Sequence, residues 1–193
     1  MRRRQAARPL ALAFTVTLSL AACGSDIDPD QALAEGLAQQ QAGNLDLAAE
    51  QYQLVLDVRP DDKYANYNLG VMEQAGGRSA LAEGYYRSAL DTDPAFVSAL
   101  FNLAILRTQA GATQEAIDLY LRVIDTQPEH AAGHFNVGIL YRDSGKTIQA
   151  DKHINEALSL DPSLADRLAT DAIDPGSPSP GGSTTPAGSS PAP

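Results

Sequence analysis

The three histidines are the first residues whose spacing could support chemistry. His130 and His134 lie four residues apart, so on a helix their rings would share one face and could hold a metal ion. No glutamate follows His130 in the manner of a metalloprotease, and no third ligand stands near the pair. His153 falls in a different helical segment. The pattern therefore predicts ordinary surface or interhelical histidines and no metal site.

Carboxylate pairs are the other candidates for catalysis. Asp61 with Asp62, and Asp91 with Asp93, stand at junctions between apolar segments, where helix caps and turns commonly use aspartate. No glycine-rich loop follows a strand-like segment, so a phosphate cradle is unsupported. We therefore expect a protein that is not an enzyme and that needs no cofactor.

Residues 1–22 have the composition of a secretion signal. Four arginines lie within the first eight residues, and the stretch from Leu10 to Ala22 then carries no charge. That stretch is shorter than the roughly 20 apolar residues that a membrane-spanning helix needs. At its end, the sequence Leu20-Ala21-Ala22-Cys23 resembles the bacterial lipobox.

The lipobox resemblance implies cleavage before Cys23, a diacylglyceryl thioether on its sulfur and often an acyl chain, such as palmitate, on the new N-terminus. It also implies export and a lipid anchor in a bacterial membrane, with the protein on the extracytoplasmic side. Residues 23–28 would then be the lipidated cysteine and a short linker. The alternative is an ordinary secreted protein with one stray cysteine. A lipidated Cys23 could not serve as a nucleophile.

The charge balance narrows the partners. The chain has 24 acidic and 14 basic side chains. Four of the basic residues precede Cys23, so the remainder carries 24 acidic against 10 basic side chains, a formal charge of −14. Nucleic-acid binding is disfavoured, because phosphate contacts need clustered lysine and arginine. An anionic membrane surface would repel the domain, which leaves the lipid as the main attachment.

A period of 34 residues runs through the middle of the chain. It relates four prolines, four glycines and four alanines, namely Pro60, Pro94, Pro128 and Pro162, Gly43, Gly77, Gly111 and Gly145, and Ala48, Ala82, Ala116 and Ala150. Between the glycine and the proline of each unit, apolar residues recur at i, i+4 and i+7, as in Ala116, Tyr120 and Val123. That spacing places them on one face of an α-helix. The glycine and the proline mark helix ends.

The period and its residue types resemble the tetratricopeptide repeat. The match includes Asn68-Leu69-Gly70, the alanine and tyrosine columns, and Ala89-Leu90 followed by Pro94. The resemblance implies an all-α fold, an α-solenoid of four helix-turn-helix units with a short C-terminal capping helix. The expected segments are four repeats in 29–164 (29–62, 63–96, 97–130 and 131–164), a cap at 165–173, and a tail at 174–193. The tail is rich in Pro, Gly, Ser and Thr, which favours disorder, with a glycosylated stalk as the alternative.

An aromatic or tyrosine residue precedes asparagine at one place in three first helices: Tyr67-Asn68, Phe101-Asn102 and Phe135-Asn136. In tetratricopeptide arrays the first helices line the concave surface, and this position faces inward. The column resembles the asparagine ladder with which certain arrays hold an extended peptide. An amide offers donors and an acceptor, so it can grip a peptide backbone without reading side chains.

The residues one turn from the asparagines would form apolar pockets, and Phe101 and Phe135 would be anchors, since aromatic residues often dominate binding energy. The predicted peptide-binding residues are Tyr64, Tyr67, Asn68, Val71, Phe101, Asn102, Ile105, Phe135, Asn136 and Ile139. Two alternatives remain open: the asparagines hold neighbouring helices together, and the aromatics are ordinary packing. A clamp for a terminal carboxylate is disfavoured, because Val71, Ile105 and Ile139 stand where it would need lysine or arginine.

Together these patterns favour a membrane-anchored adaptor that binds a peptide segment of a partner protein, similar to the lipoproteins that assist pilus, secretion or envelope assembly. A second hypothesis is a scaffold subunit that self-associates through its ends or its convex face. A third is an enzyme accessory, which the lack of an acid–base or metal constellation disfavours.

Overall fold

The computed structural model describes residues 27–169, and every regular element in that range is an α-helix. In chain order the helices are α1 (Pro29–Gln41), α2 (Leu45–Val58), α3 (Lys63–Ala75), α4 (Ser79–Thr92), α5 (Val97–Gln109), α6 (Thr113–Thr126), α7 (Ala131–Asp143), α8 (Thr147–Leu160) and α9 (Leu164–Ala169). The predicted all-α solenoid is confirmed. The predicted signal segment, Cys23 and the tail at 174–193 lie outside the described residues.

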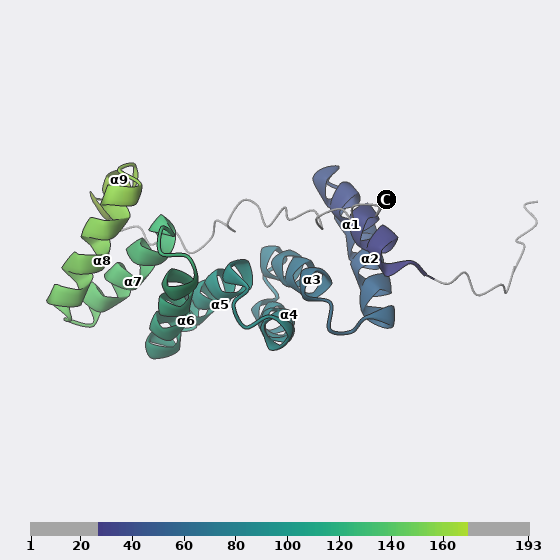
Figure 1. Ribbon diagram of the computed structural model, residues 1–193, viewed down its shortest axis with the longest axis horizontal. Coiled ribbons are helices and arrows are strands. Elements are labelled where there is room, and N and C mark those ends of the chain that lie inside the picture. The colour runs from purple at the N-terminus through teal and green to yellow at the C-terminus, as the bar shows by residue number, and fades with distance from the viewer. Residues whose placement is uncertain (1–26, 170–193) are drawn as a thin grey trace, which may run out of the picture.

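Each unit is a hairpin of two helices, and each hairpin packs against the next along the chain. The hairpins are α1 with α2, α3 with α4, α5 with α6, and α7 with α8. Figure 1 shows the stack as an arc with α3 and α5 on its inner side and α4 and α6 on its outer side. The helices α3 and α5 also contact each other, as the inner side of an arc requires. The first helices of the units therefore form an inner wall.

Side-chain caps and positive-φ glycines set the helix ends. The Asp28 carboxylate accepts hydrogen bonds from the backbone N–H groups of Asp30 and Gln31, so the predicted cap of the first helix is confirmed. The predicted column of helix-ending glycines adopts the left-handed conformation, with a φ of 72° at Gly111. There the Gly111 and Ala112 N–H groups bond back to the Thr108 and Arg107 carbonyls.

The core of each hairpin is a large side chain on the second helix packed against a small residue on the first. Tyr86 of α4 is fully buried, and a Cβ added to Gly70 of α3 would lie 2.6 Å from its ring carbon Cε1. The same pairing recurs 34 residues on, where Tyr120 faces Ala104. The predicted i, i+4, i+7 faces of the second helices are buried throughout units two to four. The period in the sequence is therefore the period of the core.

The short helix α9 covers the C-terminal end of the array. It begins at Leu164, one residue before the predicted cap at 165–173, and it is described as far as Ala169. Leu164 is buried in one cluster with Phe135 and Ile139 of α7. Over residues 27–169, no helix has the length and apolar character needed to cross a bilayer.

We expect opposite effects from alanine at two exposed glycines. Gly111→Ala forces a side chain into the left-handed region and should lower the free energy of unfolding by about 1–2 kcal/mol. Gly84 lies within α4, and a Cβ there meets no atom within 4 Å. Gly84→Ala should therefore raise the free energy of unfolding by roughly 0.5–1 kcal/mol. Urea denaturation of both variants measures the two values, and equal effects would contradict the role assigned to the turn.

Candidate functional site

All ten residues predicted to bind a peptide lie on α3, α5 and α7, the helices of the inner wall. Their accessibility differs. Tyr64 and Val71 on α3 are half-buried and reach the surface. The other eight are at most 7% exposed: Tyr67, Asn68, Phe101, Asn102, Ile105, Phe135, Asn136 and Ile139. The accessible part of the wall in the unliganded chain is therefore narrower than the predicted set.

The predicted aromatic anchors are covered by the residue that starts the next unit. The Tyr67 ring lies 5.1 Å from the ring of Phe96, and the Phe101 ring lies 4.9 Å from that of His130. Phe135 shares a cluster with Leu164, and the Arg167 guanidinium lies 5.1 Å from its ring centroid. The sequence analysis did not use the covering residues, although Phe96, His130 and Leu164 are themselves 34 residues apart.

Two of the three asparagines hold neighbouring units together. The Asn102 amide nitrogen is 3.3 Å from the Tyr86 hydroxyl and 3.4 Å from the Tyr67 hydroxyl, both in the preceding unit. The Asn136 amide nitrogen donates to the Tyr120 hydroxyl at 3.2 Å. The alternative in which the asparagines tie helices together thus describes the donor side of both amides.

Asn68 occupies the same column but bonds differently. Its amide nitrogen donates to the Tyr64 carbonyl oxygen of its own helix at 2.9 Å. On the acceptor side, the Oδ1 atoms of Asn102 and Asn136 are buried and accept no hydrogen bond from the described residues. A buried polar atom without a partner is costly, so these two oxygens are the atoms of the wall best suited to an incoming N–H.

The tyrosines that receive these bonds are held neutral by burial. Burial raises the pKa of Tyr120 to about 12 and raises that of Tyr86 further. The Tyr86 hydroxyl donates to the Gln74 side-chain oxygen at 2.7 Å while it accepts from Asn102. Each hydroxyl therefore stays protonated at any physiological pH and links the core of one unit to the wall of the next.

The histidines make structural bonds within the fourth unit. The His130 Nδ1 accepts the Gly133 backbone N–H at 3.0 Å and so caps α7. His134 and His153 face each other with their Nδ1 atoms 3.0 Å apart. Within residues 27–169, no three His, Cys, Asp or Glu side chains are grouped as metal ligands. The i, i+4 spacing of His130 and His134 thus reflects a cap and a buried contact.

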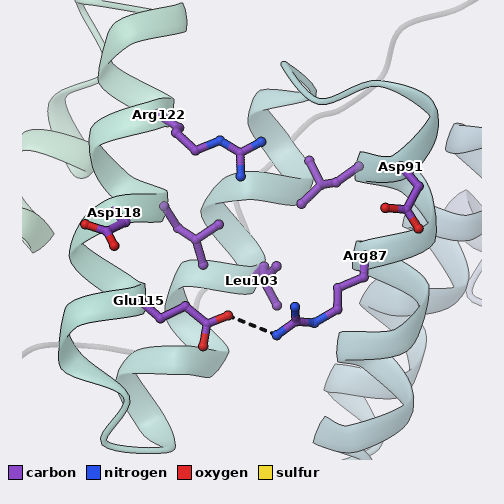
Figure 2. Close-up of a pocket in the computed structure, with 8 residues that line it drawn as sticks. Arg87, Asp91, Leu103, Glu115, Asp118 and Arg122 are labelled. Atoms are coloured by element: carbon purple, nitrogen blue, oxygen red, sulfur yellow. Dashed lines mark hydrogen bonds and ion pairs between the residues drawn. The ribbon is translucent and has the colours of Figure 1, made fainter.

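A pocket of about 390 Å³ opens on the outer side of the arc, between α4 and α6. Figure 2 shows Arg87 reaching across its mouth to Glu115, 2.9 Å away, with Leu103 of α5 behind. Arg122 points into the same space, and its guanidinium donates to the Pro94 carbonyl oxygen at 2.7 Å. Both arginines are thus engaged in bonds between units.

The sequence analysis missed this pocket, but a signal for it existed. Leu119, which lines the pocket, stands in one 34-residue column with Tyr85 and His153. A leucine fills less of the space between two outer helices than a tyrosine does. The pocket belongs to the outer face and shares no residue with the predicted peptide-binding set.

Comparison with protein families identifies the repeat. The chain matches the tetratricopeptide repeat at residues 33–95, 73–131 and 131–164. These matches together span the four hairpins from within α1 to the start of α9. No curated protein resembles the chain closely enough to count as a relative.

Solved structures share the fold. A crystal structure of MamA is 19% identical, with a TM-score of 0.64 over 72% of this chain and 81% of that chain. A second MamA structure, from AMB-1, is 24% identical, with a TM-score of 0.61 over 76% and 80%. The pilF protein of Pseudomonas aeruginosa is 26% identical, with a TM-score of 0.62 over 74% and 68%.

We predict that the asparagines differ in their importance for stability. Asn102→Ala removes the amide that bonds two buried tyrosine hydroxyls and should lower the free energy of unfolding by about 1–3 kcal/mol. Asn68→Ala removes only a bond within one helix and should cost less than about 1 kcal/mol. Urea denaturation measures both, and an equal loss in the two variants would show that the bonds between units are unimportant.

Proposed function

Because the chain belongs to the tetratricopeptide repeat family, we propose that it is a protein–protein interaction adaptor that holds a peptide segment of a partner along its inner wall. Repeat arrays of this kind present extended concave surfaces built from stacked units. The observation that carries the proposal is the recurrence of an unbonded amide oxygen, at Asn102 and at Asn136, in successive units of that wall. An N–H of a bound backbone would satisfy each of these oxygens in turn.

Access to the two oxygens requires a change in the side chains that cover them. Asn102 is fully buried, and the Tyr67 hydroxyl lies against its amide nitrogen. A peptide would first meet the half-buried Tyr64 and Val71 of α3. It would then displace Tyr67 from Asn102, which exposes an aromatic ring for the ligand to pack on. In this proposal the amides act after the apolar surface has been engaged.

We extend the proposal to the membrane. The lipobox-like sequence that ends at Cys23 supports a lipid anchor on the extracytoplasmic side of a bacterial membrane. The acidic balance of the chain disfavours nucleic acid as a partner. A role in envelope, pilus or secretion assembly fits an anchored adaptor. The adaptor itself would catalyse no reaction and need no cofactor.

A second candidate function is a scaffold subunit that self-associates through its outer face. Several large apolar side chains are exposed on the second helices, namely Leu45 and Leu47 on α2, Leu81 on α4 and Ile148 on α8. Ile148 is 83% exposed. Burial of such side chains against a second copy would be favourable. Light scattering of the chain at increasing concentration distinguishes this candidate from a monomeric adaptor.

The adaptor proposal predicts that one charge on the inner wall abolishes peptide binding. A photocrosslinking amino acid at Tyr64 first captures the partner in cells, and a peptide from the crosslinked segment is then synthesised. We expect Val71→Glu to weaken the binding of that peptide at least tenfold, because a carboxylate on the accessible apolar surface must lose its water when the peptide binds.

The matched control lies in the same unit on the outer face. Leu81 is 55% exposed on α4, and Leu81→Glu places the same charge there. We expect this variant to bind the peptide within twofold of the unchanged chain, as isothermal titration calorimetry can measure. Weakened binding in Leu81→Glu with normal binding in Val71→Glu would assign the partner to the outer face instead.

The anchor has its own test. Cys23→Ser removes the sulfur that the lipid would modify and should move the protein from the membrane fraction to the soluble fraction. It should also abolish incorporation of labelled palmitate. Ser25→Ala is the control and should leave both measurements unchanged. Membrane attachment that persists in Cys23→Ser would refute the lipid anchor while leaving peptide binding untouched.

A further inference from the structure

All three histidines of the chain lie in the fourth unit, where they link its helices. His134 on α7 and His153 on α8 are 7% and 9% exposed, and their Nδ1 atoms are 3.0 Å apart. His130 stands at the start of α7, with its ring 4.9 Å from that of Phe101 on α5. One pair thus joins the two helices of the unit, and one ring joins the unit to the preceding one.

The bonds of the pair fix its protons. The His134 Nε2 lies 2.9 Å from the Pro128 carbonyl oxygen, which can only accept, so Nε2 carries the hydrogen. The His134 Nδ1 is then the acceptor, and the His153 Nδ1–H donates to it. If both rings were protonated, two N–H groups and two positive charges would face each other at this distance. The pair therefore cannot hold a proton on each ring without separating.

The third ring is neutral for a different reason. The His130 Nδ1 is the acceptor that caps α7 through the Gly133 N–H. A proton on Nδ1 turns this acceptor into a donor, so the cap is lost. The ring also covers Phe101, one of the predicted anchors of the inner wall. Protonation of His130 therefore weakens both the start of α7 and its contact with α5.

The surroundings offer little compensation for added charge. On α8, Lys152 opposes a proton on His153 and Glu156 favours one. From α7, the Tyr141 ring stacks against His153 at 5.8 Å. Toward His130, α5 presents Phe101, and the polar group that α6 directs at α7 is the Tyr120 hydroxyl, which Asn136 engages. On α9, the Arg167 guanidinium lies over Phe135.

Burial acts in the same direction as the geometry. It lowers the pKa of His130 and of His153 below the usual value of 6.5, and the neighbouring His134 lowers both further. A lowered pKa in the folded state means that the unfolded chain binds protons first as the pH falls. The stabilisation is therefore complete above about pH 6.5 and is lost as the pH falls toward the lowered values.

We propose that the fourth hairpin, α7 with α8, is an acid-sensitive latch that releases from the rest of the array below about pH 6.5. Release would uncover Phe101 and the end of the inner wall, while the hairpins from α1 to α6 keep their own packing. Repeat arrays allow such partial release, because each unit contacts only its neighbours. The release does not require a bound peptide.

The third unit supplies the residues for the test. Phe96, Leu100 and Leu119 occupy there the positions that His130, His134 and His153 occupy in the fourth unit. The variant that combines His134→Leu with His153→Leu places an existing apolar pair of the array into the latch. Adding His130→Phe completes the exchange. These changes remove all three titrating rings and retain residue types that the repeat already packs.

Amide hydrogen exchange of the full chain between pH 7.5 and 5.5, corrected for intrinsic rates, measures opening helix by helix. We expect the opening constant of α7 and α8 to rise by up to tenfold per pH unit for each ring that stays neutral in the folded state. The α3 and α4 amides should change far less. The triple variant should lose the pH dependence of α7 and α8.

Two results would overturn the latch. One is an unchanged pH dependence of α7 and α8 in the triple variant. The other uses the unaltered chain: if NMR shows the three rings titrating at or above pH 6.5 without loss of α7 protection, the rings accept protons inside the intact hairpin. The second measurement stands even if the triple variant does not fold.

Discussion

The close approach of the two helices in each hairpin is the constraint on which the rest of the structure depends. It needs a residue without a bulky side chain on the first helix and a large ring on the second, as with Gly70 and Tyr86. A fully buried ring at that place brings its hydroxyl to the boundary with the next unit, where an asparagine meets it. The same tyrosine therefore fills the core of one hairpin and sets the position of the next.

This coupling explains why the inner wall is so well buried. The atoms that could contact a peptide are also those that bind the units together, as with Asn102 and its two tyrosines. The amide satisfies its donors within the chain and leaves its oxygen unbonded. A ligand that reached this oxygen would exchange bonds with Tyr67 and would need an N–H to compensate. Binding and the alignment of neighbouring units are thus linked through a single side chain.

Much of the fold could be predicted from the sequence, because the buried positions recur with the period of the units. The alanine and tyrosine columns lie in the core as expected, and Asp28 caps the first helix. The candidate site could be predicted only in part. The wall helices were identified, but the bonds of the asparagines were not, since Asn68 and Asn102 share a column and differ in their partners. The covering of Phe101 by His130 depends on a contact between units that no pattern within one unit reveals.

Departures from the period are where the units acquire individual properties. In the column of Tyr85, Leu119 and His153, the leucine coincides with the outer pocket and the histidine with the buried pair. The wall is uneven for the same reason. At its C-terminal end, Phe135 and Ile139 pack with Leu164 of α9, whereas Tyr64 and Val71 near the middle reach the surface. A peptide that uses the wall as it stands would therefore begin at α3 and extend toward α5. It could extend to α7 only as the contacts made by α9 and His130 open.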